Sequence, residues 1–347
     1  MRVNASSARW QLWRSIDLTS KIMREISSSP SQWNARRSYT EVARKLGVDE
    51  ETVRNRLKMM REMGLLVGWR LIVNARLLAM EASNLVLEFD DPESKETAAA
   101  HIRSADGVVL IQSFFGKALQ VTFFHPSEKD SGGGASDETV ASRTTGAKVA
   151  ARWKVNLPRC EHKPREIDWR IIGLMLRNAE RRFPEIAQDL KVSTRTVKRR
   201  VNLMMGSSAF FVQPELDFKK AVGVLPCQLL IQCAPEKKRE IDDLVVSKFE
   251  RIVFRLTNSD THSIFTILCA NVAEMKEILK WARSQRGVTL ARTDITENQD
   301  YVHEWLEREV GRRAKNEPAG RRPGVQKGQT KAQKAAFVDA AIVARTV

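Results

Sequence analysis

Basic and amide side chains recur at helical spacing in one short stretch of the chain, TRTVKRRVNLMM (194–205). Three apolar residues at the i, i+4 and i+7 spacing form the face expected to be buried: Val197, Val201 and Met204. Four hydrogen-bond donors lie on or beside the opposite face: Arg195, Lys198, Arg199 and Asn202. In the DNA major groove, arginine can donate two hydrogen bonds to guanine, and asparagine can pair with adenine. The stretch is therefore typical of a helix that contacts double-stranded DNA.

A second stretch, EETVRNRLKMM (50–60), repeats this pattern with less positive charge. Its exposed donors are Arg54, Asn55 and Lys58. Glu50 and Glu51 suit the positive end of the helix dipole, but they repel phosphate. We therefore expect the first helix to bind DNA more weakly than the second, with Asn55 as its best base-reading residue. The alternative, in which the cations only form a solvated helix face, is stronger for the first helix than for the second.

The overall charge also favours a polyanionic partner. The chain of 347 residues has 58 Lys and Arg against 42 Asp and Glu, a formal net charge of +16. Each cation that neutralises a phosphate releases counterions, which favours binding. No apolar run approaches the length of a membrane span, and the N-terminus is too polar for a signal peptide. We expect a cytoplasmic, chromosome-associated protein without membrane contact.

The two helices belong to a longer duplication. Setting Thr52 against Thr196 aligns residues 39–60 with residues 183–204 without a gap, which indicates a duplicated domain. In each copy a short helix, a turn and an N-capping residue (Asp49 or Ser193) precede the third helix, the arrangement of a helix-turn-helix. Lys191 replaces the turn glycine of the first copy, and a left-handed turn residue other than glycine costs about 1 kcal/mol.

After each third helix the sequence predicts a wing. GLLVGWRLIVN (64–74) alternates around Gly68 like a β-hairpin, and Arg70 within it is expected to contact a DNA phosphate. SAFFVQPELD (208–217) is a weaker second wing that lacks basic residues. This lack leaves open whether both copies bind DNA.

A sheet domain follows each helix-turn-helix. From residue 225 the pattern runs strand, helix, two strands, helix and strand, the βαββαβ order of a ferredoxin-like domain. The first copy shows the same start, then a Gly-, Ser- and Thr-rich stretch expected to be a flexible loop over 127–150. RWKVN (152–156) is its expected closing strand, so the first domain is predicted to be degenerate, with its second helix lost or weak.

The chain at this point resembles the Lrp/AsnC family of transcriptional regulators, in which a winged helix-turn-helix precedes a ferredoxin-like effector and assembly domain. The matching residues are the Ile-Asp opening of the first helix, LGVDEETVRNRLKMMREMGLLVGWRLIVN (46–74) and ELDFKKAVG (215–223). The resemblance implies an α+β fold, homo-oligomers formed through the sheets, and a possible amino-acid effector. Because family members usually carry one copy, the duplication suggests that one chain forms a pseudo-dimer.

These observations predict five segments along the chain. They are a winged helix-turn-helix over 1–76, a degenerate ferredoxin-like domain over 80–157, a second winged helix-turn-helix over 163–218, a second ferredoxin-like domain over 222–310, and a disordered basic tail over 311–347. KAAFVDAAIVA (334–344) could form a short helix within that tail.

The favoured function is a sequence-specific, DNA-binding transcription regulator without a cofactor or metal. One alternative is a nonspecific architectural DNA-binding protein. Another is an enzyme, because siroheme decarboxylases resemble the same architecture and would need His and Arg side chains in a tetrapyrrole pocket. His101, His125 and His262 lie in or beside the sheet domains, but no pair of them has a spacing that indicates a catalytic site.

The four cysteines form no CxxC pair, and Cys160-Glu161-His162 is an isolated group of possible metal ligands. We therefore predict neither a catalytic nor a metal site.

Overall fold

The computed structural model describes residues 16–27, 39–127, 146–221 and 223–315. The first helix-turn-helix comprises α2 (Ile16–Ser27), α3 (Tyr39–Leu46) and α4 (Glu50–Glu62). The Asp49 carboxylate accepts a hydrogen bond from the Thr52 backbone N–H at 2.6 Å, so it caps α4 as predicted. The residues predicted to be buried on α4 are fully enclosed: Val53, Leu57 and Met60.

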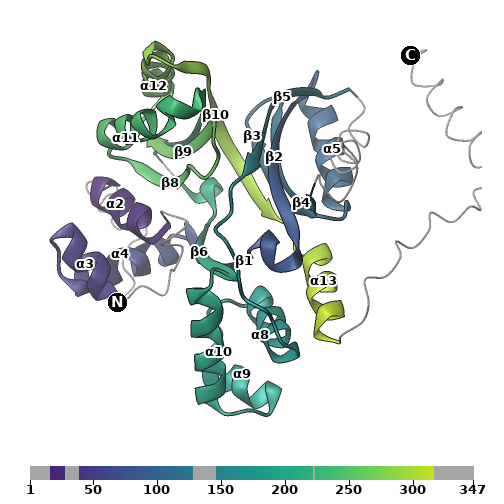
Figure 1. Ribbon diagram of the computed structural model, residues 1–347. Coiled ribbons are helices and arrows are strands. Elements are labelled where there is room, and N and C mark those ends of the chain that lie inside the picture. Colours follow the sequence, from purple (N-terminus) through teal and green to yellow (C-terminus); the bar gives the residue numbers. More distant parts are fainter. Residues whose placement is uncertain (1–15, 28–38, 128–145, 222, 316–347) are drawn as a thin grey trace, which may run out of the picture.

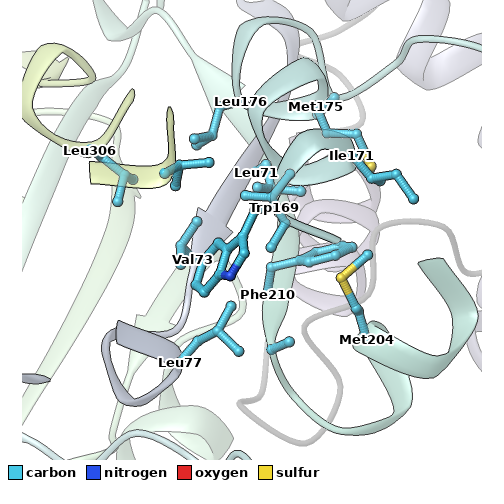
Figure 2. Close-up of a cluster of buried hydrophobic side chains, with 14 of the residues drawn as sticks. Leu71, Val73, Leu77, Trp169, Ile171, Met175, Leu176, Met204, Phe210 and Leu306 are labelled. Carbon is cyan, nitrogen blue, oxygen red and sulfur yellow. The ribbon is translucent and has the colours of Figure 1, made fainter. Parts of the chain in front are cut away.

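The second helix-turn-helix comprises α8 (Glu166–Arg177), α9 (Phe183–Leu190) and α10 (Thr194–Gly206). Ser193 caps α10 by accepting from the Thr196 N–H at 3.1 Å. The apolar face of α10 packs into a core cluster that extends well beyond the three helices. Figure 2 shows Trp169 of α8 and Phe210 of the following strand in one cluster with Val73, which lies far away in the sequence.

The predicted hairpin wings are wrong, because each copy supplies one strand and the two strands pair with each other. β1 (Leu66–Val73) and β6 (Phe210–Leu216) form a two-stranded antiparallel sheet, with Leu66 opposite Leu216 and Val73 opposite Phe210. Gly68 lies at an irregularity in this pairing and not at a turn. The two strands have similar lengths, and β6 satisfies the backbone groups of β1 that a hairpin would have paired.

The remaining strands form one eight-stranded sheet in the order β5-β2-β4-β3-β10-β7-β9-β8. The first half contains β2 (Met80–Glu88), α5 (Pro92–Arg103), β3 (Val108–Phe114), β4 (Ala118–Pro126) and β5 (Lys148–Val155). The second contains β7 (Leu225–Cys233), α11 (Lys238–Lys248), β8 (Ile252–Leu256), β9 (His262–Cys269), α12 (Val272–Ser284) and β10 (Val288–Tyr301). In each half the closing strand lies beside the first strand, as the ferredoxin-like order requires. The predicted α+β fold is thus confirmed.

The long strand β10 joins the two half-sheets. Residues 288–295 of β10 pair with β7, whereas residues 296–301 pair with β3 of the first half. Figure 1 shows β10 crossing from the half covered by α11 and α12 toward the half covered by α5. The half-sheets also face each other, because Gln228 of β7 donates a hydrogen bond to Gln120 of β4 at 2.9 Å. The duplicated halves therefore form one body within a single chain.

Three short 3-10 turns accompany these elements: Ala75–Leu78, Phe218–Lys220 and Pro235–Lys237. The last helix of the described residues, α13 (Glu304–Ala314), packs on α8 through Leu306 and Val310. The predicted start of the tail at residue 311 is therefore too early, because the last turn of α13 lies beyond it. The predicted loop over 127–150 ends too late, because β5 begins at Lys148. The degenerate second helix of the first sheet domain, the rest of the loop and the remainder of the tail lie outside the described residues.

Candidate nucleic-acid interface

The donors predicted on α10 are all exposed to solvent: Arg195, Lys198, Arg199 and Asn202. In the part of the chain that the structure describes, Arg195, Lys198 and Arg199 form no ion pair with an acidic side chain, and the first turn of α10 contains no acidic residue. Their charges are consequently available to a ligand. Lys191 lies exposed at the turn that precedes the helix and adds to the same positive surface.

The donors predicted on α4 are exposed too, but their charges are largely paired. Arg54 forms an ion pair with Glu50 and lies 5.2 Å from the centre of the Tyr39 ring. The Lys58 amine lies 3.9 Å from a Glu62 oxygen. Asn55 remains exposed between them. The third helices of the two helix-turn-helix units, α4 and α10, therefore differ in their electrostatics. Among the predicted donors, all of which lie within the described residues, the positive charge without an acidic partner lies on α10.

Arg70 does not lie where a phosphate contact requires, so that prediction is corrected. Its side chain is only 13% exposed, and its guanidinium pairs with Glu215 on β6 at 2.5 Å. It also contacts His303 and lies 4.1 Å from the centre of the Tyr301 ring. The pairing of β1 with β6 turns Arg70 toward the interior, because its position opposite Gln213 faces the sheet domains. The alternation of apolar and polar residues within 64–74 could not show which face of this strand the rest of the protein would cover.

A buried ion pair, which was not predicted from the sequence, fixes the position of α10 against α8. Arg200 donates to both carboxylate oxygens of Asp168, which is fully buried, and His162 lies 3.1 Å from the same carboxylate. Burial opposes ionisation of Asp168, but the bonds from Arg200, the Arg165 backbone and His162 outweigh it, so its pKa lies below the ordinary value. Truncating one partner of such a pair typically costs about 3–5 kcal/mol.

The duplication contained a signal for this pair. Asp168 and Arg200 align with Asp17 and Arg56 of the first copy. In that copy Asp17 is half-exposed and pairs instead with Arg251 at 3.1 Å. Within the isolated Cys160-Glu161-His162 sequence, His162 therefore has a structural role, because it contacts the buried Asp168 carboxylate. Among the described residues, no group of three or more His, Cys, Asp or Glu side chains could hold a metal ion.

Of the three histidines considered for catalysis, two are buried in contact with other side chains and one is exposed. His125 is buried and lies 2.8 Å from the Ser83 hydroxyl. His262 is buried against Trp153, and His101 is exposed.

A cavity of about 150 Å³ lies between the half-sheets, and none of these three histidines lines it. Its wall includes Arg70, Tyr301 and His303, of which Tyr301 and His303 were not considered from the sequence.

None of the helices in the described part of the chain has the length and apolar character of a membrane span.

Comparison with known families identifies both helix-turn-helix units. A profile for the AsnC-type helix-turn-helix domain matches residues 166–205, and one for a winged helix-turn-helix DNA-binding domain matches residues 17–67. HTH-type transcriptional regulator Ptr1 of Methanocaldococcus jannaschii is 31% identical over 84 residues, covering 24% of this chain and 57% of the regulator. LrpA of Pyrococcus horikoshii is 40% identical over 63 residues, covering 18% and 42% of the respective chains. The chain thus spans about half the length of the curated relatives it matches.

Two solved structures align with this chain at low sequence identity. The siroheme decarboxylase NirDL, in complex with an iron-uroporphyrin III analogue, aligns with 84% of this chain and 97% of its own at 15% identity and a TM-score of 0.47. AsnC of E. coli aligns with 40% of this chain and 95% of its own at 13% identity and a TM-score of 0.31.

Proposed function

We propose that this chain, which carries helix-turn-helix domains of the Lrp/AsnC type at two positions, is a transcription regulator that binds double-stranded DNA. The observation that carries the proposal is the unpaired positive charge on α10, the helix that this motif places in the major groove. The matched relatives are named HTH-type transcriptional regulators, which supports the same function.

The unequal recognition helices favour an asymmetric DNA site. β1 and β6 pair in an antiparallel arrangement, so one chain presents two related but different helix-turn-helix units. Arg195, Lys198 and Arg199 of α10 can neutralise phosphates or read guanine directly. On α4, Glu50 already neutralises Arg54, so a DNA contact would have to break that pair. We therefore assign most of the affinity to α10 and a selective contact through Asn55 to α4.

The test is fluorescence anisotropy with labelled duplex DNA across a range of salt concentrations. Lys198→Ala combined with Arg199→Ala should weaken binding at least tenfold, because two free cations are lost. The slope of log affinity against log salt should fall by about 0.9 for each phosphate contact removed. The matched variant, Arg54→Ala combined with Lys58→Ala, should have a smaller effect, because Glu50 and Glu62 already pair those charges.

Two outcomes would contradict this proposal. Negligible affinity of the unaltered chain for any duplex at low salt would remove DNA binding altogether. Equal effects of the two double variants would remove the assignment to α10. Genome-wide mapping of bound sites then separates a regulator from a nonspecific architectural protein, since a regulator yields a defined site with two unlike half-sites.

We propose no reaction for the interior of the sheet domains. Sites for drug-sized ligands usually have volumes of roughly 300–1,000 Å³, and a tetrapyrrole is larger than such ligands. The cavity between the half-sheets has a volume of about 150 Å³. A tetrapyrrole absorption band that stays with the protein after incubation and gel filtration would count against this part of the proposal.

A further inference from the structure

We propose that the cavity between the two half-sheets is a binding site for a small, uncharged molecule with an apolar body and a hydrogen-bond acceptor, such as a cyclic ketone. The cavity is bounded by strands of both halves and by the β1–β6 pair. This inference does not depend on DNA binding, because no residue of α4 or α10 lines the cavity.

The main support is an unused hydrogen-bond donor on a fully buried side chain. Asn84 of β2 lines the cavity and is 0% exposed. Its Oδ1 accepts a hydrogen bond from the Thr122 hydroxyl at 2.6 Å, on the residue directly opposite it in β4. Its Nδ2 is buried and has no hydrogen-bond partner among the described residues. A buried donor without a partner is unfavourable, so a ligand that supplies an acceptor gains from satisfying it.

The second half of the molecule shows how the same position can be satisfied. Gln228 of β7 lies opposite Thr266 of β9, just as Asn84 lies opposite Thr122. The longer Gln228 side chain reaches across the interface and donates to Gln120 at 2.9 Å. Asn84 is shorter by one methylene and leaves its donor free. The unused donor is therefore particular to the first half and does not follow from the ferredoxin-like order itself.

The charges around the cavity exclude an ionic ligand. Arg70 has a second buried donor without a partner, its Nε, while its other nitrogens contact Glu215 and His303. Arg70 and Glu215 cancel each other's charge. Burial, together with the nearby Arg70 cation, lowers the pKa of His303, and burial raises the pKa of Tyr301 to about 12. Both side chains are thus neutral at physiological pH, and a carboxylate placed here would be a buried charge without a counter-ion.

The size and remaining walls of the cavity define the apolar part of the ligand. Its lining is mostly aliphatic and aromatic and includes Phe124, Val155, Phe254 and Ile264. An apolar protein cavity of similar volume accommodates a benzene-sized molecule. Cyclohexanone has this size, one acceptor and no charge, so it is a suitable probe.

The experiment titrates the full chain with cyclohexanone and follows backbone amide shifts by NMR. We expect saturable binding, with shifts concentrated at residues of β2, β4 and β7. Asn84→Leu removes the donor and should weaken binding at least tenfold. Ala82→Leu keeps Asn84 but fills the cavity from the same strand, and it should have the same effect. Ser83→Ala lies between these positions on the opposite face of β2 and should leave the affinity unchanged.

Benzoate and leucine serve as charged and zwitterionic probes, and neither should bind in the cavity. The proposal is overturned if benzoate binds there as tightly as cyclohexanone, or if Asn84→Leu and Ala82→Leu, shown to be folded by their thermal transitions, leave the affinity unchanged. It is also overturned if no probe binds saturably, since the cavity then holds water only.

Discussion

His262 links the two half-sheets through a contact between side chains. Its ring stacks on Trp153 of β5, with the ring centres 4.9 Å apart and the planes within 9°. Burial, with a smaller contribution from the Lys238 cation, lowers its pKa from 6.5 to about 4. The neutral ring is therefore favoured in the folded protein, and protonation of His262 destabilises the folded state.

This shift predicts how stability depends on pH. The histidine binds a proton in the unfolded chain near pH 6.5 but only near pH 4 in the folded chain. Its stabilising contribution is thus complete above pH 6.5 and is lost as the pH falls from 6.5 to 4. The total is on the order of 3 kcal/mol. His262→Phe keeps a stacked ring and should flatten this dependence, as measured by urea unfolding at pH 7.5 and pH 5.

Replacement of an exposed histidine, His101→Gln, provides the control and should leave the dependence as it is in the unaltered chain. If the unaltered chain loses no more stability than His262→Phe between these pH values, His262 does not carry the effect.

Among the elements, the turns of the two helix-turn-helix units differ in conformational strain. Gly47 has a φ of 67° and Lys191 has a φ of 54°, so both occupy the left-handed region. Glycine adopts this conformation freely, whereas a side chain is strained there. The alignment of Lys191 with Gly47 predicted this difference, and the backbone angles confirm it.

Lys191→Gly should therefore stabilise the second helix-turn-helix by about 1 kcal/mol, and Gly47→Lys should destabilise the first by a similar amount. A Cβ at Gly47 would meet no other atom within 4 Å, so the cost there is conformational and not steric. Urea unfolding of both variants measures the two effects. A loss of stability in Lys191→Gly would show that the lysine side chain contributes more than its backbone costs. Removing its charge should also weaken DNA binding slightly.

At the scale of the whole molecule, the two duplicated halves depend on each other. β1 pairs with β6, β10 pairs with β3, and the half-sheets meet through Trp153 and His262 and through Gln120 and Gln228. The contacts that join the two halves thus lie within one chain. Assembly of several chains stays a prediction, and light scattering at several concentrations measures it.

This dependence predicts the behaviour of a divided chain. Two polypeptides separated by a break between residues 127 and 146 should assemble when expressed together, because β5 must still pair with β2, and β10 with β3. Each alone should lack a cooperative thermal transition, since β1 or β6 would lose its partner. Co-purification through a tag on one polypeptide measures assembly. A cooperative transition in either one alone would mean that the halves are independent domains.

The sequence by itself determined the elements whose patterns are local. Helical spacing located α4 and α10 and the side chains they expose, and Asp49 and Ser193 marked where each helix begins. These features depend on residues three or four positions apart, so short stretches contain them fully. The apolar runs after residue 225 predicted the order of strands and helices in the second sheet domain.

Only the tertiary structure decided which distant elements meet. The strand that contains Arg70 could have folded back as a wing, and its alternation was the same in either case. Pairing with β6 turned that arginine toward Tyr301 and His303. The same long-range pairing enclosed the cavity beside Asn84. A strand's own residues specify that one face must be buried, but the partner strand and the packing of the whole molecule determine what covers that face.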